Sequence, residues 1–304
     1  MSNSPIRIGT RDSKLAMWQA HTVARLLRVA GFQTEIVAVK SKGDLDTSKP
    51  LHELGTTGIF TKVLDDALED NTVDIAVHSL KDYPTVPPKG IVLSAHLERE
   101  DPMDLLIPSG DISWTNDVDS TVTIGTGSIR RKAQWLHKYP HHTTENLRGN
   151  VQTRLKKLEE NDWSGIIMAS AGLRRMEAVP ENAIALDWMI PAPAQGVIGI
   201  THREGDNEAL EACRKLNVET AEITSTVERS FLRTLEGGCS APIGSLARIS
   251  GDQIFFTGCL HSLDGKQEIK IERNAPLADW RELGARWAHE VIDLGGSEIL
   301  KELK

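Results

Sequence analysis

The sequence predicts a multidomain α/β protein that ends in an α+β region. Strand-like apolar runs alternate with helical patterns up to residue 169, which is typical of sheets covered by helices. From about Glu219 the pattern changes, and strand-like runs follow one another before a final helix. The chain has 304 residues, enough for two or three domains rather than one.

The first α/β region is expected to form a parallel sheet with helices between its strands. Strands are predicted at residues 6–9, 35–39 and 73–78. A helix begins after Ser13, a suitable N-cap, and Gly31 can end it. A second helix is predicted at 60–69, with an apolar stripe formed by Val63, Leu64, Ala67 and Leu68.

A second α/β region follows. Strands are predicted at 122–125 and 165–169, and helices at 129–137 and 151–160, the second capped by Asn150. Residues 99–102 and 191–196 have the composition of linkers, because proline interrupts any regular element there.

The C-terminal region is predicted to be α+β. A helix at 221–235 precedes the strand-like runs, and a second helix at 277–294 ends the pattern. The runs cover residues 245–249, 254–260 and 267–271. Asp264-Gly265 is a hairpin-turn signal between the last two.

The composition excludes several classes of function. A net charge of −8 disfavours binding to nucleic acid or to anionic membranes. No apolar run approaches a membrane span and residues 1–8 lack an apolar signal core, so we expect a cytoplasmic protein. Three cysteines argue against a disulfide framework. Without a Cys-x-x-Cys or His-Glu-x-x-His pattern, no metal site is expected.

Arginines gather at predicted strand ends and helix starts. They occur in Gly125-Thr-Gly-Ser-Ile-Arg-Arg, in Leu147-Arg-Gly-Asn-Val-Gln-Thr-Arg and at Arg11. Helix starts favour anions, and guanidinium groups bind carboxylates or phosphates through paired hydrogen bonds. A solvated arginine is the simpler explanation for each site alone. Three such sites, each after a predicted strand, indicate a small polyanionic ligand.

Cys239 lies in Leu235-Glu-Gly-Gly-Cys-Ser-Ala-Pro, which is not a regular helix or strand pattern. Gly237 and Gly238 permit a left-handed backbone, and Pro242 stops a regular element. A thiol in such a turn is accessible, and an accessible thiolate is a candidate for covalent chemistry. A small, buried, inert cysteine is the alternative interpretation.

Asp82 follows Lys81 at the end of the predicted strand 73–78. A cap of a turn or helix is the ordinary role of an aspartate at such a place. Among several arginines, however, a carboxylate can pair with a cation that develops during a reaction. A site that only binds anions would not need it.

Taken together, these motifs resemble the porphobilinogen deaminase family, also called hydroxymethylbilane synthase. The resemblance rests on Val77-His-Ser-Leu-Lys-Asp, Gly125-Thr-Gly-Ser-Ile-Arg-Arg, Leu147-Arg-Gly-Asn-Val with Thr153-Arg, Ala171-Gly-Leu-Arg-Arg and Leu235-Glu-Gly-Gly-Cys. It implies two α/β lobes like those of type II periplasmic binding proteins and a smaller C-terminal α+β domain. The implied domains are 1–99 with 197–216, then 100–196, then 217–304.

The resemblance also implies a transferase of porphyrin, tetrapyrrole and heme biosynthesis that acts as a cytoplasmic monomer. Such an enzyme condenses four porphobilinogen molecules head to tail, releases ammonia, and hydrolyses the product to linear hydroxymethylbilane. Its primer is a dipyrromethane cofactor, held here by a thioether to Cys239. Every pyrrole unit carries acetate and propionate, so the product is a polyanion, which agrees with the arginines of an acidic protein.

The resemblance further implies the roles of individual residues. Asp82 is the expected catalytic group, because it can stabilise the azafulvenium cation left by loss of ammonia. Besides Cys239, the expected cofactor contacts are Ser79, Lys81, Thr126, Ser128, Arg130, Arg131 and Arg154. The expected substrate contacts are Arg11, Ser13, Gln19, Arg148 and Arg175.

The chain departs from the family's usual pattern at three places. Thr57 stands where a basic residue near the cofactor is common. Gly127 replaces the first serine of Gly-Thr-Ser-Ser, which removes one hydroxyl contact. Ala192-Pro-Ala-Gln-Gly stands where Ala-Val-Gly-Gln-Gly is common, which stiffens an expected hinge.

Two other functions fit parts of the pattern. A non-catalytic, two-lobed anion-binding protein would explain the arginines, but it needs no accessible thiol in a third domain. A cysteine-nucleophile acyltransferase would explain the thiol, but the sequence offers no convincing histidine partner.

Cys239→Ser is expected to fold but to lack the covalent dipyrromethane, because a hydroxyl is a far weaker nucleophile than a thiolate near neutral pH. Intact-mass spectrometry should give the bare chain for this variant and a surplus of two pyrrole units for the wild type. Cys213→Ala, in a predicted helix, should keep the surplus. A full adduct on Cys239→Ser would place the attachment elsewhere.

Overall fold

The computed structural model describes residues 4–39, 59–117, 119–235 and 241–303. Cys239 with its flanking glycines, and Thr57, lie outside these residues. The described residues form two compact units. The first contains residues 4–39, 59–100 and 196–223, and the second contains residues 101–195 and 224–303. The predicted boundary at residue 217 falls inside the first unit, and the separation of a third domain from residues 100–196 stays a prediction.

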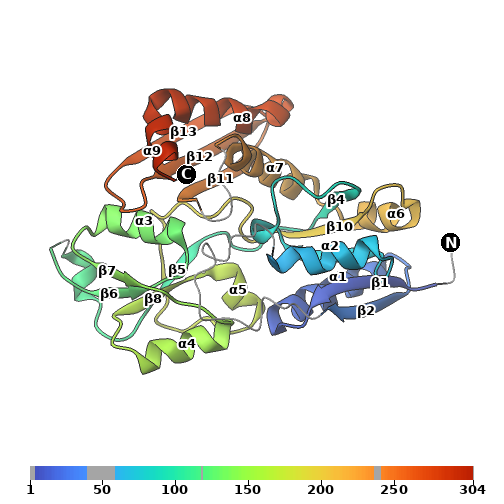
Figure 1. Cartoon of the computed structure of the whole chain (residues 1–304), viewed down its shortest axis with the longest axis horizontal. Coiled ribbons are helices and arrows are strands. Elements are labelled where there is room, and N and C mark those ends of the chain that lie inside the picture. The colour runs from blue at the N-terminus through green and yellow to red at the C-terminus, as the bar shows by residue number, and fades with distance from the viewer. Residues whose placement is uncertain (1–3, 40–58, 118, 236–240, 304) are drawn as a thin grey trace. The chain divides into compact units, whose positions relative to one another are not determined.

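The first unit is built on a five-stranded sheet in the order β2-β1-β3-β10-β4, of which Figure 1 labels β1, β2, β4 and β10. These strands are β1 (Ile6–Arg11), β2 (Thr34–Val39), β3 (Ile75–Ser79), β4 (Ile91–His96) and β10 (Ile198–Arg203). β1 is parallel to β2 and β3, whereas β10 is antiparallel to β3 and β4. The sheet is therefore mixed rather than wholly parallel, because the chain returns to it after residue 195 and adds β10 in the opposite direction.

Three helices cover the first sheet: α1 (Lys14–Val29), α2 (Ile59–Glu69) and α6 (Asn207–Leu216). Ser13 caps α1 as predicted, since its hydroxyl accepts a hydrogen bond from the amide of Ala16 at 3.3 Å. Gly31, after the helix, has a φ of 93°. The buried side chains of α1 and α6 pack with those of β1, β3 and β10 into one core.

The second unit contains a five-stranded sheet in the order β7-β6-β8-β5-β9. Its strands are β5 (Asp104–Pro108), β6 (Thr123–Gly125), β7 (Thr143–Glu145), β8 (Gly165–Ala169) and β9 (Ile184–Ala185). β6 is parallel to β7 and β8, and β5 is antiparallel to β8 and β9. The two five-stranded sheets therefore share one pattern of strand directions, each with a single antiparallel strand in the fourth position. This confirms the predicted pair of α/β lobes.

The helices of this lobe are α3 (Ile129–Lys138), α4 (Val151–Glu160) and α5 (Ser170–Arg175). Ser128 caps α3, and Asn150 caps α4 as predicted. Short 3-10 segments occur at Leu80–Asp82, Ser113–Asn116 and Leu277–Asp279.

The C-terminal part of the second unit is an antiparallel sheet with helices, as predicted. It consists of β11 (Ile243–Ser250), β12 (Gln253–His261), β13 (Glu268–Pro276), α7 (Glu219–Thr234), α8 (Trp280–Val291) and α9 (Ser297–Glu302), with a π turn at Ile292–Gly296. Phe256 of β12 packs on Phe231 of α7 and Trp287 of α8, with ring centroids 5.0 and 4.7 Å apart. Gly265, in the predicted hairpin turn, has a φ of 74°. Among the described residues, no helix is both long and apolar enough to cross a membrane.

A buried carboxylate joins α7 to two other parts of the second unit. Glu228 is inaccessible to solvent, and its two carboxylate oxygens accept hydrogen bonds from the amides of Ala194 and Ala247, each at 2.7 Å. Ala194 has a φ of 61°, which a residue with a Cβ seldom adopts. Glu228 thus fixes the backbone of residues 191–195, the connecting segment, and the middle of β11.

Glu228→Gln should lower the free energy of unfolding by roughly 1–3 kcal/mol, because an amide group replaces one of the two acceptors of buried N–H groups. Urea unfolding measures this change. Glu211→Gln, an exposed position on α6, is the matched control and should change stability little. Equal stabilities of the two variants would contradict the structural role of Glu228.

Candidate active site

The predicted arginines of the second unit lie at one edge of its five-stranded sheet. β6 is parallel to β7 and β8, so the carboxyl ends of these three strands meet at the same edge. Arg130 and Arg131 follow β6, in the first turn of α3. The remaining members of the group are Arg148 and Arg154, after β7, and Arg175, after β8. The structure thus brings these residues to one edge of the sheet, as their positions after strands suggested.

The loops after β6 and β7 are in direct contact. The amide of Thr126 donates a hydrogen bond to the carbonyl of Glu145 at 2.8 Å. A Cβ added at Gly127 would lie 2.5 Å from the carbonyl oxygen of Leu147. The two arginine motifs thus touch one another, and the glycine at 127 is what allows this approach.

Asp104, at the start of β5, is the partner of the first two arginines. One of its oxygens accepts a hydrogen bond from Arg130 Nη2 at 2.7 Å, and the other accepts from Arg131 Nη2 at 2.8 Å and Nε at 3.1 Å. The Asp104 side chain is fully buried, and those of the arginines are 5% and 6% exposed. Burial acts to raise the pKa of Asp104, but the charges of Arg130 and Arg131 outweigh it and hold the pKa well below its usual range.

This cluster carries an excess of positive charge. One carboxylate faces two guanidinium groups, which also donate hydrogen bonds to the carbonyls of Ile190 and Ile167. Nε of Arg130 and Nη1 of Arg148 are buried and have no acceptor among the described atoms. A buried donor without an acceptor is costly, so the site is suited to an anionic ligand that supplies one.

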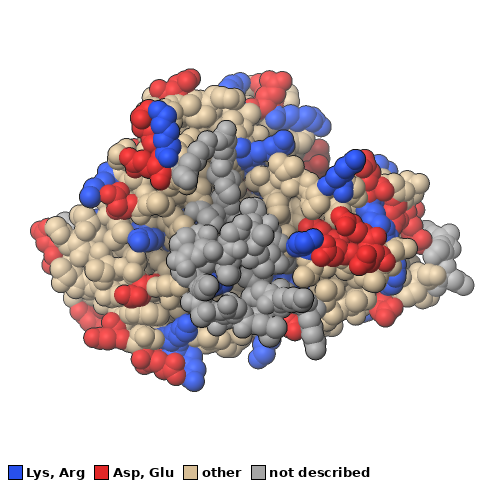
Figure 2. All heavy atoms as spheres, in the orientation of Figure 1, with Lys and Arg blue, Asp and Glu red and all other residues tan. Residues whose placement is uncertain are grey.

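The surface agrees with this interpretation. Four of the arginines are buried, namely Arg130, Arg131, Arg148 and Arg175. Figure 2 accordingly shows Lys and Arg mixed with Asp and Glu on the described surface in view, rather than one basic patch. Arg154 is half-buried, and its Nε donates to the carbonyl of Gly149 at 2.8 Å.

The predicted residues of the first unit also lie at one sheet edge. Arg11 ends β1 and Ser13 follows it. β1 is parallel to β3, which ends at Ser79 and is followed by Lys81 and Asp82. Gln19 of α1 is buried, and its Nε2 donates to the Ser79 hydroxyl at 2.8 Å. This bond joins two predicted site residues that are 60 positions apart in the chain.

Asp82 projects from an anchored segment. Its neighbours Leu80 and Tyr83 are 0% and 1% exposed, whereas Asp82 itself is exposed. The amide of Leu80 donates to the carbonyl of Val197 at 3.0 Å, and the amide of Tyr83 donates to the carbonyl of Leu80 at 3.2 Å. The structure therefore presents the Asp82 carboxylate to solvent on a fixed backbone.

The two cysteines in the described part of the chain do not suit covalent chemistry. Cys213 and Cys259 are buried, and burial raises the pKa of each thiol to about 12. A thiol with such a pKa is almost entirely protonated near neutral pH.

The sequence analysis missed Asp104. The available signal was an aspartate at the head of the apolar run Asp104-Leu-Leu-Ile, because a charged residue entering a buried strand needs a partner. The partner itself was not predictable, since Arg130 and Arg131 lie 26 and 27 positions away.

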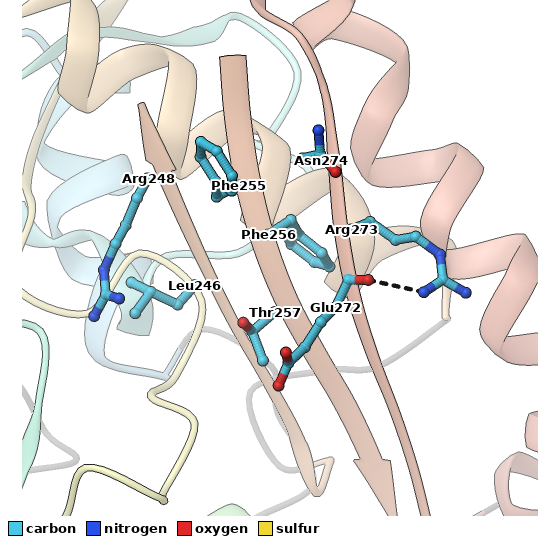
Figure 3. Close-up of a pocket in the computed structure, with 8 residues that line it drawn as sticks. All are labelled: Leu246, Arg248, Phe255, Phe256, Thr257, Glu272, Arg273 and Asn274. Carbon is cyan, nitrogen blue, oxygen red and sulfur yellow. Dashed lines mark hydrogen bonds between the residues drawn. The ribbon is translucent and has the colours of Figure 1, made fainter. Parts of the chain in front are cut away.

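A separate pocket of about 250 Å³ lies on the three-stranded sheet (Figure 3). It is lined by Leu246, Arg248, Phe255, Phe256, Thr257, Glu272, Arg273 and Asn274. None of the predicted site residues lines it.

The fold and the site define a protein with two α/β lobes whose sheets share one pattern of strand directions, and with buried arginines suited to a small polyanion. The family description "Porphobilinogen deaminase, dipyromethane cofactor binding domain" matches residues 6–211, and "Porphobilinogen deaminase, C-terminal domain" matches residues 222–293. The chain belongs to the porphobilinogen deaminase family. This confirms the predicted family, the transferase class and the dipyrromethane cofactor.

Curated relatives agree over nearly the full length. The porphobilinogen deaminase of Syntrophotalea carbinolica is 38% identical over 100% of this chain and 97% of its own. That of Campylobacter hominis is 41% identical over 97% of each chain. Among solved structures, the periplasmic VFT2 domain of Bordetella pertussis BvgS has a TM-score of 0.42 at 12% identity, over 69% of this chain and 86% of that one.

Gly127→Ser restores the residue that is common in the family, yet we expect it to reduce activity. The added Cβ would clash with the carbonyl of Leu147, so the backbone next to Arg148 must move. We expect kcat/KM for porphobilinogen to fall roughly ten- to hundredfold. Gly110→Ser, where no atom lies within 4 Å of the added Cβ, is the control. Wild-type kinetics for Gly127→Ser would contradict the expected clash.

Proposed function

We propose that the protein condenses four porphobilinogen molecules on a dipyrromethane primer attached to Cys239 by a thioether, and then releases linear hydroxymethylbilane by hydrolysis. The observation that carries this proposal is the group of buried arginines at the carboxyl ends of β6, β7 and β8. Each pyrrole unit carries two carboxylates, which fit the buried Nε of Arg130 and Nη1 of Arg148, two donors without an acceptor among the described atoms.

The attachment at Cys239 is supported by elimination among three cysteines. Cys213 and Cys259 are buried and have raised pKa values, so neither offers a thiolate near neutral pH. Cys239 is the third, and its Gly-Gly-Cys-Ser-Ala-Pro context is the one that suggests an accessible turn.

The residues fit a cofactor that carries carboxylates. The excess charge around Asp104 and the unpaired Nε of Arg130 supply what such a group needs. When bound, the dipyrromethane supplies the primer for the first addition. We propose that it is held by Ser79, Lys81, Thr126, Ser128, Arg130, Arg131 and Arg154.

We propose that Arg148 binds a carboxylate of the incoming substrate or of the growing chain. Its Nη1 is buried and has no acceptor among the described atoms, so a ligand oxygen would satisfy it. The other proposed substrate contacts are Arg11, Ser13, Gln19 and Arg175.

Asp82 is proposed as the catalytic group. Loss of ammonia from porphobilinogen leaves an azafulvenium cation, and the other charged groups of the proposed site are mainly cationic. A carboxylate about 4 Å from that cation contributes about 4 kcal/mol at an effective dielectric constant near 20. The exposure of Asp82 on an anchored segment allows such an approach.

We further propose a cytoplasmic monomer with three domains, at residues 1–99 with 197–216, 100–196 and 217–304. The separate family matches for residues 6–211 and 222–293 support a boundary near residue 217. The small-molecule substrate and the net charge of −8 agree with a protein that binds neither nucleic acid nor membrane.

Asp82→Asn should keep the fold and the bound cofactor while kcat falls by about 10²–10⁴, because the size is kept and the charge is lost. Asp82→Glu should retain more activity than Asn, since it keeps the charge and displaces it by one methylene. Steady-state kinetics, with cofactor content measured by mass, tests both. Asp70→Asn, an exposed position in the same unit, is the control. An Asn variant within a few-fold of wild type would assign the chemistry to another group.

A further inference from the structure

A glutamine lies on the buried side of α3, close to the first arginine of the site. Gln134 is buried and follows Arg130 by one helical turn, at the spacing i, i+4. Its neighbours Ala133 and Trp135 are buried as well. A side-chain amide carries donors and an acceptor, and leaving them unpaired away from water is costly. A glutamine at this position therefore needs hydrogen-bond partners.

Both partners belong to one residue, Ile190. Gln134 Oε1 accepts a hydrogen bond from the amide of Ile190 at 2.7 Å, and Gln134 Nε2 donates to the carbonyl of Ile190 at 2.9 Å. Because these two backbone groups are one donor and one acceptor, they determine the orientation of the side-chain amide. Gln134 thus holds the backbone of Ile190, which directly precedes the connecting segment, through a reciprocal pair of hydrogen bonds.

The carbonyl that Gln134 binds is also a contact of Arg130. Arg130 Nη1 donates to this oxygen at 2.7 Å, and Arg130 Nη2 donates to Asp104 at 2.7 Å. The guanidinium is planar, so acceptors at both terminal nitrogens set its orientation. The third nitrogen, Nε, is buried and has no acceptor among the described atoms. The position of the Ile190 carbonyl therefore helps to determine where this unpaired donor points.

β11 confines the same stretch of backbone from another element. A Cβ added at Gly244 would lie 2.8 Å from the carbonyl oxygen of Ile190. The amide of Ser245 donates to the carbonyl of Pro191 at 3.0 Å. Residues 190 and 191 are thus in contact with both α3 and β11, and the side chain of Gln134 is a contact that a substitution can remove without adding bulk.

We propose that Gln134 is a positioning residue for Arg130: through the Ile190 carbonyl it holds the guanidinium in the orientation that presents Nε to a carboxylate of the dipyrromethane. Without Gln134, the Ile190 amide loses its acceptor and the carbonyl loses one of two donors. Ile190 can then shift, and the guanidinium bonded to it shifts as well. The inference rests on the proposed role of Arg130 in holding the cofactor.

The test measures how fast the cofactor-free chain gains pyrrole units. Wild type, Gln134→Met, Arg130→Lys and the double variant, made in cells that produce no porphobilinogen, are mixed with porphobilinogen. The disappearance of the bare-chain mass is followed by intact-mass spectrometry. Methionine has a similar length but no amide, so we expect Gln134→Met to load roughly three- to thirtyfold more slowly, as for one or two hydrogen bonds. Gln152→Met, at an exposed position of α4, is the matched control and should load like wild type.

The double variant shows whether Gln134 acts through Arg130. Lysine keeps the charge but has one nitrogen, so it cannot reproduce the two fixed contacts and the free Nε of the guanidinium. We therefore expect Gln134→Met to slow loading no further in the Arg130→Lys chain. An equal factor in both backgrounds, or wild-type loading by Gln134→Met, overturns the inference and leaves the role of Arg130 standing if Arg130→Lys loads slowly. Wild-type loading by Arg130→Lys overturns the role of Arg130, and the inference with it.

Val291→Ala separates positioning from stability. Val291 is a buried residue of α8 in the same unit, and its truncation lowers Tm without removing a hydrogen bond. At a temperature where both variants are folded, Val291→Ala should load at the wild-type rate, whereas Gln134→Met should not. Equally slow loading of the two variants would reduce Gln134 to a structural role. Once loaded, Gln134→Met should have the wild-type KM for porphobilinogen, and a raised KM would assign Gln134 to substrate binding instead.

Discussion

The buried contact between Asp104 and two adjacent arginines supports most of the second unit's site. Asp104 opens β5, and the arginines open α3, so their bonds attach the antiparallel strand to the helix that follows β6. Arg131 also reaches the carbonyl of Ile167 in β8. Gln195 donates from one amide nitrogen to Asp104 and to the carbonyl of Pro102. One carboxylate thereby orients the arginines and fixes the end of the connecting segment.

The incomplete charge balance of this cluster reconciles stability with binding. A fully neutralised pair would have little affinity for a further carboxylate, and an unpaired buried guanidinium would destabilise the fold. Two arginines on one aspartate keep an excess positive charge in a position shielded from water. An acidic protein can in this way bind a polyanion without displaying a basic surface, and the exposed acids that give the net charge of −8 need not face the ligand.

The sequence predicted those features that depend on neighbours in the chain. The caps Ser13 and Asn150, the helices they begin and the strand-end positions of the arginines follow from local spacing. Pairings between segments that are far apart in the chain could not be predicted in this way, because no local pattern marks them. β10 was not expected, because its partner Ser79 lies over a hundred positions before Ile198. The burial of Arg130 by Asp104 and the close approach of Leu147 to Gly127 likewise depend on contacts that exist only after folding.

The placement of β10 also constrains how the chain can fold during synthesis. β10 lies between β3 and β4, but the ribosome makes it only after all of residues 101–195. Until then β3 lacks its neighbour on one side, and β4 has no strand to pair with in this sheet. The exposed edge of β3 must stay unpaired while more than a hundred residues between Ser79 and Ile198 are made, and an unpaired strand edge favours aggregation during that time. Closure of the N-terminal sheet is thus a late event, and sequence-distant pairing of this kind is slow.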